Sequence, residues 1–156
     1  MQKATFGAGC FWGVEAAFRQ TQGVVATSVG YAGGHVPQPS YQQVCTDRTG
    51  HAEVVQVEFD PARISYERLL DVFFDCHDPT QMNCQGPDFG TQYRTAIFYH
   101  DEAQQQAAQA AKSRLQASGR FRKPIVTEIV AMTDYWIAED YHQQYLEKRG
   151  LAHCHI

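Results

Sequence analysis

The pentapeptide Gly9-Cys10-Phe11-Trp12-Gly13 separates two segments with different apolar spacing. Residues 4–8 form a short apolar run that predicts a strand, and from residue 11 the apolar residues recur at helical spacing. We therefore expect Cys10 at a strand-to-helix junction, where unpaired backbone N–H groups and the positive end of the helix dipole favour a thiolate. Trp12 falls off the apolar stripe of this helix, so its indole is free to lie beside the sulfur.

The composition is that of an ordinary globular protein. A chain of 156 residues is long enough for one domain with its own core, which we expect to span 1–156. The net charge of −4 and the lack of a Lys/Arg block argue against a nucleic-acid partner. The N-terminus has no signal-peptide pattern and no apolar run is long enough to span a bilayer, so we expect no membrane partner and a cytoplasmic location.

Five cysteines without an export signal argue against a structural disulfide framework. In the cytoplasm such residues are catalytic, redox-active or metal-binding, or they are inert thiols. The cysteine and histidine spacings match no metal-binding framework, so we expect no metal site. The five are Cys10, Cys45, Cys76, Cys84 and Cys154.

The apolar periodicities predict the element order β-α-β-β-α-β followed by α-β-α. The first six elements match the split βαβ pattern, which predicts an α+β fold: a two-layer α/β sandwich with a ferredoxin-like βαββαβ core, an extra helix-strand-helix and a C-terminal tail. Ser65 and Asp101 are expected to cap two of the helices. The last helix is predicted over 136–148, and residues 150–156 are predicted to form a flexible tail.

Glu53 lies at the start of a strand with a clear period of two. Val55, Val57 and Phe59 are apolar and share its face, whereas Gln56 is polar. A carboxyl group in this row is either desolvated, which raises its pKa and favours the protonated acid, or solvated because the strand starts one residue later. The first alternative makes Glu53 a general acid.

Two long polar loops are expected to line a site with this acid. The first runs from Gly30 to Tyr41, and the second runs over 80–92 and closes at Tyr93. Their tyrosine hydroxyls are donors that could orient an oxygen atom. Two other functions remain open from the residues alone: a cysteine hydrolase with His51 or His142 as base, and a binding module without enzymatic activity.

Six motifs resemble those of the A-type peptide methionine sulfoxide reductase family (MsrA), and together they cover nearly the whole chain. The motifs at residues 9–13, 49–53 and 85–94 are the most specific in combination. The six are Gly9-Cys10-Phe11-Trp12-Gly13, Gly30-Tyr31-Ala32-Gly33-Gly34, Thr49-Gly50-His51-Ala52-Glu53, His77-Asp78-Pro79-Thr80-Gln81, Gln85-Gly86-Pro87-Asp88-Phe89-Gly90-Thr91-Gln92-Tyr93-Arg94 and Ala138-Glu139-Asp140-Tyr141-His142-Gln143-Gln144-Tyr145.

The resemblance implies reduction of methionine S-sulfoxide, free and in proteins, and hence repair of oxidative damage. Cys10 would attack the sulfoxide sulfur while Glu53 protonates its oxygen. Tyr41 and Tyr93 would hydrogen-bond that oxygen. Cys10 would become a sulfenic acid.

The resemblance also implies the roles around this centre. Phe11 and Trp12 would hold the substrate methyl group, and Asp88 would orient the site through hydrogen bonds. Cys154 would resolve the sulfenic acid to a disulfide, with Cys45 and Cys84 as the less favoured alternatives. Thioredoxin or a dithiol would reduce the disulfide, no other cofactor is implied, and we expect a monomer.

Overall fold

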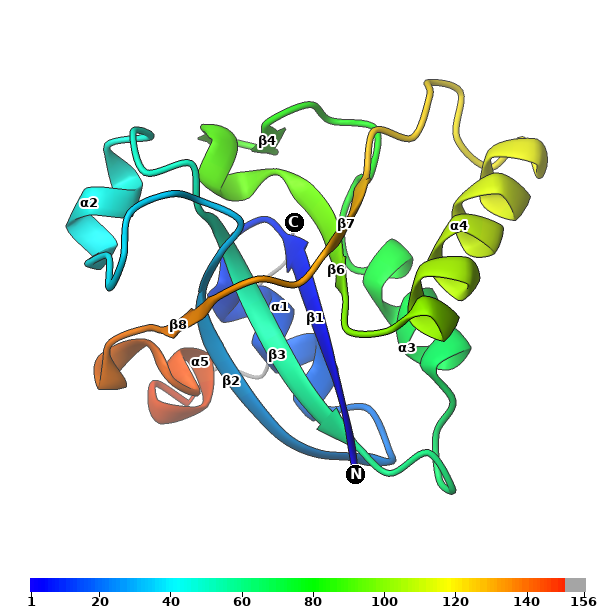
Figure 1. The fold of residues 1–156 in the computed structure, drawn as a ribbon, viewed down its shortest axis with the longest axis horizontal. Coiled ribbons are helices and arrows are strands. Elements are labelled where there is room, and N and C mark those ends of the chain that lie inside the picture. Colours follow the sequence, from blue (N-terminus) through cyan, green and yellow to red (C-terminus); the bar gives the residue numbers. More distant parts are fainter. Residues whose placement is uncertain (151–156) are drawn as a thin grey trace.

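The computed structural model describes residues 1–150, which form an α+β fold around a curled six-stranded sheet (Figure 1). The strand order is β7-β6-β1-β3-β2-β8, and every neighbouring pair is antiparallel except the parallel pair β6–β7. The strands are β1 (Gln2–Ala8), β2 (Val24–Ala32), β3 (Ala52–Phe59), β6 (Thr95–Tyr99), β7 (Glu128–Ala131) and β8 (Tyr135–Ile137).

Five α-helices, one two-stranded hairpin and two 3₁₀ turns complete the described part of the chain. A two-stranded hairpin and the 3₁₀ turn that follows it lie between α3 and β6. The helices are α1 (Phe11–Arg19), α2 (Tyr41–Cys45), α3 (Tyr66–Asp75), α4 (Glu102–Ala117) and α5 (Tyr145–Lys148), the hairpin strands are β4 (Cys84–Gln85) and β5 (Asp88–Phe89), and the 3₁₀ turns are η1 (Thr91–Tyr93) and η2 (Asp140–His142). None of the helices in residues 1–150 has the length and apolar character needed to cross a membrane.

The main core lies between one face of the sheet and the helices α1, α3 and α4. Phe6 of β1 is fully buried at its centre, with its ring stacked 5.2 Å from Phe18 of α1 and 5.2 Å from Phe73 of α3. The period-two alternation of β3 places Val55 and Val57 in the same cluster. This packing fixes α1, and hence its first residues, against β3.

The opposite face of the sheet is crossed by the segment between β7 and β8 (Figure 1). Because β7 lies at one edge of the sheet and β8 at the other, this segment passes over the strands between them. Met132 and Tyr135 pack on a second cluster that contains Val54 and Phe98. The hydroxyl of Tyr135 lies 2.6 Å from the hydroxyl of Ser28 on β2.

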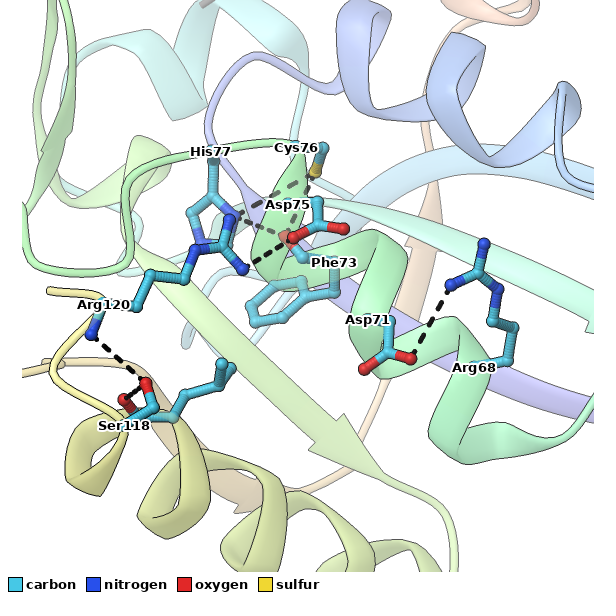
Figure 2. A network of polar contacts seen from close by, with 9 residues as sticks. Arg68, Asp71, Phe73, Asp75, Cys76, His77, Ser118 and Arg120 are labelled. Carbon is cyan, nitrogen blue, oxygen red and sulfur yellow. Dashed lines mark hydrogen bonds and ion pairs between the residues drawn. The ribbon is translucent and has the colours of Figure 1, made fainter.

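His77 fixes the end of α3, where Figure 2 shows it beside Phe73 and Cys76. Both of its ring nitrogens are paired. Its Nδ1 lies 2.6 Å from the carbonyl oxygen of Phe73 and must carry the proton, since that oxygen only accepts. Its Nε2 lies 2.7 Å from the hydroxyl of Thr95 on β6. Burial lowers the pKa of His77 to about 4, so the imidazole is neutral at neutral pH. Arg120 also reaches Asp75 at 2.8 Å and ties the loop after α4 to the same helix end.

The predicted helix over 136–148 is wrong. Residues Tyr135–Ile137 instead form β8 at the edge of the sheet, and only Tyr145–Lys148 are α-helical. The side chain of Gln143 explains the difference, because its amide accepts from the backbone N–H of Val29 at 2.8 Å and donates to the carbonyl of Val29 at 2.9 Å. A long-range pairing with β2 thus outweighs the helical spacing of the apolar residues.

The other elements were predicted more closely. Ser65 and Asp101 cap α3 and α4 by accepting hydrogen bonds from Arg68 N–H at 3.1 Å and Gln104 N–H at 2.8 Å, which confirms both assignments. The predicted loops contain structure that the sequence analysis missed, namely α2 and the hairpin β4–β5. The predicted tail, apart from Gly150, lies outside the described residues.

Candidate active site

Cys10 occupies the N-cap position of α1, at the strand-to-helix junction predicted for it. The turn before it needs glycine, since Gly9 has φ of +99°, in the left-handed region. A Cβ atom at Gly9 would also lie 2.8 Å from Cγ of Gln85. The side chain of Gln85 is held in turn by two hydrogen bonds to the backbone of Asp78, of 3.0 Å and 2.6 Å. The position of the thiol is therefore set by β1, α1 and the loop after α3.

Glu53 is buried, with 1% of its surface exposed, so the desolvated alternative from the sequence is the one observed. Its Oε1 accepts a 3.1 Å hydrogen bond from the backbone N–H of Phe11, the first residue of α1. Its Oε2 is buried and has no hydrogen-bond partner among the described residues. Desolvation raises the pKa of Glu53 to about 8, the Phe11 N–H opposes this, and the charge of Asp88 adds to it. The carboxyl group is thus mostly protonated at neutral pH, with one oxygen available for a ligand.

Tyr41 begins α2 and Tyr93 ends η1, and both tyrosines are close enough to Glu53 for its charge to act on them. Burial raises the pKa of each tyrosine well above its ordinary value, and the charge of Glu53 acts on both in the same direction. Both hydroxyls therefore stay protonated and can donate hydrogen bonds. The electrostatic interactions of Tyr93 also include Cys10 and Asp88.

Phe11 and Trp12 lie on the side of α1 that faces Tyr41. The ring of Phe11 is buried, 6.3 Å from the ring of Tyr41 and 5.2 Å from that of His142. Trp12 is partly buried, and its indole N–H donates to His142 Nδ1 at 2.9 Å. From its place off the apolar stripe we expected the indole to be free to lie beside the sulfur; in the structure it is held by His142 and stacks on Tyr145 of the C-terminal segment.

Glu139 also contacts the site, although the sequence did not single it out. Its carboxylate accepts from the Tyr31 hydroxyl and from the backbone N–H of Tyr41, each at 2.9 Å. These contacts fix the first residue of α2 and so the ring of Tyr41. The signal was present in the motif at residues 138–145, but the helical interpretation of that stretch gave its polar residues no role.

The other described cysteines lie on different elements. Cys45 is exposed at the end of α2 and shares a side-chain hydrogen bond with Tyr41. Cys84 lies on β4, and Cys76 donates from its Sγ to the carbonyl of Phe73 at the end of α3, so the structure does not place Cys76 with the predicted site. Cys154 lies outside the described residues.

His51 is not arranged as a base. Its Nδ1 accepts from the backbone N–H of Gly34 at 3.0 Å, and its Nε2 lies 2.7 Å from the carbonyl of Val36. Both ring nitrogens therefore brace the first loop, which counts against the cysteine-hydrolase alternative. Among residues 1–150 no group of three or more His, Cys, Asp or Glu side chains could hold a metal ion.

The fold thus places a buried carboxyl group with a raised pKa against the start of the helix that has Cys10 at its N-cap, and a hydrogen bond from Phe11 N–H joins the two. A model of the peptide methionine sulfoxide reductase family matches residues 2–156. The chain is 62% identical over 156 residues to the peptide methionine sulfoxide reductase MsrA of Acidobacterium capsulatum, covering 100% of both chains. The chain belongs to the peptide methionine sulfoxide reductase family, A type, and is an oxidoreductase.

Solved structures agree with this assignment. Mxr1 from Saccharomyces cerevisiae in its reduced form has a TM-score of 0.90 and 39% sequence identity, covering 96% of this chain and 86% of that chain. Mxr1 in complex with Trx2 has a TM-score of 0.65 and 27% identity, covering 92% of this chain and 84% of that chain.

Proposed function

We propose that this protein reduces the S epimer of methionine sulfoxide, free and in proteins, with Cys10 as nucleophile and Glu53 as general acid. The observation that carries the proposal is the Glu53 carboxyl group. It is buried, has a pKa raised to about 8, and is bonded through Oε1 to the helix start beside Cys10 while Oε2 has no partner among the described residues. A buried acid of this kind suits a substrate oxygen that must be protonated.

The reaction follows from these groups. The Cys10 thiolate forms a bond to the sulfoxide sulfur, and the sulfoxide oxygen takes the proton of Glu53 as its negative charge develops. Tyr41 and Tyr93 donate hydrogen bonds to the same oxygen, which stabilises that charge in a site with little water. The protonated oxygen is then transferred to Cys10 as the sulfur–oxygen bond of the substrate and the transient bond between the two sulfur atoms break, so that methionine leaves and Cys10 becomes a sulfenic acid.

Phe11 and Trp12 supply the apolar wall for the substrate methyl group. In methionine sulfoxide the sulfur carries a methyl group, which is apolar and of fixed size, and a polar oxygen. A wall on one side and an acid on the other therefore select one hand of the tetrahedral sulfur. Asp88 orients this arrangement through hydrogen bonds, and its charge supports the raised pKa of Glu53.

A second thiol completes the cycle. Its sulfur attacks the sulfenic acid of Cys10, water leaves, and a disulfide forms. We assign this role to Cys154. A thioredoxin dithiol then reduces the disulfide by thiol exchange, which the complex of the yeast relative with Trx2 supports. This chemistry restores oxidised methionine in damaged proteins, and we place it in the cytoplasm, in a monomeric protein of one domain.

We also propose that the sheet and its helices contain a ferredoxin-like core. The strand order β6-β1-β3-β2 within the sheet supports a ferredoxin-like core, because two split βαβ units would give that order. In this arrangement α1 and α3 are the two crossover helices and form the second layer.

Incubation with racemic methionine sulfoxide and dithiothreitol tests the function. We expect consumption of the S epimer with formation of methionine. If neither epimer is consumed, or only the R epimer, the proposal is wrong. For the resolving thiol, one turnover without reductant followed by peptide mapping should give a Cys10–Cys154 disulfide, whereas a bond from Cys10 to Cys45 or Cys84 would contradict the assignment.

A further inference from the structure

A groove of about 1310 Å³ lies between α1, the end of α3, the hairpin β4–β5 and the loop after α4. The chemistry above does not use it, since neither Cys10 nor Glu53 lines it. Small-ligand sites in proteins have volumes of roughly 300 to 1,000 Å³, so this groove has room for a short stretch of polypeptide. Figure 2 shows one of its walls, where Arg120 of the loop reaches Asp75 at the end of α3.

The hairpin β4–β5 separates the groove from the active site. Cys84 pairs with Phe89 across the hairpin, and both line the groove. Gln85 pairs with Asp88, and since successive side chains of a strand point to opposite faces, this second pair lies toward the site. Gln85 lies against the turn at Gly9, and the charge of Asp88 raises the pKa of the catalytic acid. The hairpin is therefore a wall that the groove and the active site share.

The groove also follows α1 away from the site. Gly13 and Ala17 line it, and they lie one and two helical turns after Cys10. A rise of 1.5 Å per helical residue places them about 5 and 10 Å beyond Cys10 along the helix. An extended polypeptide advances about 3.3 Å per residue, so a chain with its sulfoxide at Cys10 reaches the groove within about two to four residues.

The groove carries more positive than negative charge, although the whole chain has a net charge of −4. Residues 120–123 read Arg-Phe-Arg-Lys, and all of them line it. Arg120 is already paired at the end of α3, and the carboxylate of Asp78 accepts from a hydroxyl and a backbone N–H of its own loop. Arg122 and Lys123 are exposed and have no ion-pair partner within residues 1–150. Two cations are thus left for an acidic ligand.

The groove also offers apolar surface. Met82 and Phe89 are large apolar side chains that are exposed, and both line it. Phe121 lines it as well and packs partly against the main core. Surfaces that bind polypeptides combine apolar contacts with charged groups around them. A small anion would use the charges alone, whereas a polypeptide with acidic side chains uses both features.

We propose that this groove binds the polypeptide next to the oxidised methionine of a protein substrate, and that it favours acidic side chains about two to four residues from the sulfoxide. This inference rests on the proposed function for its substrate. Arg122 and Lys123 attract the acidic side chains, while Met82 and Phe89 contact apolar ones. Free methionine sulfoxide is too short to reach the groove from Cys10.

Single-turnover reduction of two matched peptides tests the preference. Each peptide carries one methionine S-sulfoxide, flanked on both sides at the distances given above by Asp in one peptide and by Lys in the other. At low salt and subsaturating peptide, we expect the protein to reduce the Asp peptide about tenfold faster than the Lys peptide. Because salt screens exposed charges, about 0.5 M NaCl should remove most of this difference. A rate ratio of one or below at low salt would overturn the inference.

Charge reversal assigns the preference to the groove. Arg122→Glu/Lys123→Glu should abolish or invert the ratio of the two rates. The control Arg63→Glu/Arg114→Glu makes the same change in net charge at exposed positions outside the groove and should keep the parent ratio. Met82→Ser removes apolar surface without a change in charge and should slow both peptides by a similar factor of about three. If the reversal prevents folding, Arg122→Gln/Lys123→Gln should lower the ratio by a smaller factor. A parent-like ratio in either folded double variant would contradict the proposal.

Thioredoxin is the other occupant that the experiment distinguishes. A single turnover consumes no reductant, so it reports on the peptide alone. If Arg122→Glu/Lys123→Glu keeps the peptide ratio and slows only the thioredoxin-dependent recycling of the enzyme, the groove faces the reductant and the inference is wrong.

A binding measurement without chemistry keeps the failure of this inference distinct from failure of the proposed function. The chain has three methionines, so protein labelled with ¹³C-methyl methionine gives three methyl signals. Of these residues Met82 lines the groove, whereas Met132 packs on the opposite face of the sheet. We expect the unoxidised Asp peptide at about 1 mM to shift the Met82 signal and to leave the Met132 signal in place.

The outcomes of this measurement are separate from activity. If the protein reduces neither epimer, the proposed function fails, while a shift of the Met82 signal still shows that the groove binds an acidic polypeptide. A Met82 signal that the Asp peptide does not move would overturn the inference even in an active enzyme.

Discussion

Glu53 and His77 are both buried titratable side chains, but they differ in how many of their polar atoms have a hydrogen-bond partner. His77 at the end of α3 has both ring nitrogens paired, with Phe73 and with Thr95. Glu53 has one oxygen paired and the other without a partner among the described residues. Since an unpaired buried polar atom costs stability, its retention in Glu53 indicates a site for a ligand, whereas the complete pairing of His77 indicates a structural role.

The two groups also depend on pH in opposite directions. The pKa of Glu53 is raised from 4.5 to about 8, so the folded protein keeps a proton that the unfolded chain releases, and stability falls as pH rises from 4.5 to 8. The pKa of His77 is lowered from 6.5 to about 4, so the unfolded chain binds a proton that the folded protein excludes, and stability falls as pH drops from 6.5 to 4.

The largest expected effect is that of Glu53→Gln, which keeps the shape of the side chain and removes its acidic proton. We expect the single-turnover rate of methionine formation to fall by about 10³-fold. The same change should raise the free energy of unfolding by about 2 to 4 kcal/mol at pH 8, with no difference at pH 4.5. Single-turnover reactions quenched at set times measure the rate, and urea unfolding measures the free energy of unfolding. Glu58→Gln, on the same strand but half-exposed, is the control and should change neither.

The tyrosine hydroxyls come next. Tyr41→Phe and Tyr93→Phe each remove one donor to the sulfoxide oxygen and leave Glu53 in place, so each should lower kcat/KM by about 10- to 100-fold. Activity within twofold of the parent in both variants would show that Glu53 acts without them. Steady-state kinetics with dithiothreitol provide the measurement.

His77→Leu should affect stability and not catalysis. It leaves the Thr95 hydroxyl and the Phe73 carbonyl with fewer partners, and we expect a loss of about 2 kcal/mol in unfolding free energy at pH 7.5. The loss should shrink toward pH 4, where the parent protein no longer benefits from the neutral ring. Urea unfolding at both pH values tests this, and a fall in kcat of tenfold or more in folded protein would contradict the contrast with Glu53.

Cys76 should give the smallest effect. Burial raises the pKa of its thiol to about 12, and its Sγ already donates to the Phe73 carbonyl. We expect Cys76→Ala to change kcat/KM by less than about twofold, because a protonated thiol is a weak nucleophile. In native protein treated with iodoacetamide at pH 8, peptide mapping should find Cys45 alkylated well before Cys76.

The features that were predicted correctly from the sequence are those that local patterns determine. The spacing after Cys10 predicted α1, the alternation in β3 placed Glu53 with Val55 and Val57, and the caps at Ser65 and Asp101 are observed. Each of these depends on neighbours within a few residues.

The parts that sequence reasoning missed depend on distant partners. The stretch at 136–148 has a helical apolar spacing, but Gln143 and β8 pair with β2, more than a hundred residues away in the chain. Glu139 acts on Tyr41 and Tyr31 across a similar separation. No local pattern encodes these contacts. The contacts of Trp12 with His142 and Tyr145 could therefore not be predicted from the sequence.

The central claim is that Glu53 is a neutral carboxylic acid at physiological pH. Infrared difference spectra between the parent protein and Glu53→Gln, recorded from pH 5 to pH 10, test it directly. We predict a carbonyl band of a protonated carboxyl group at pH 6 that disappears with a midpoint near the pKa of about 8. A carboxylate band for Glu53 already present at pH 6, with a midpoint near 4.5, would contradict the account.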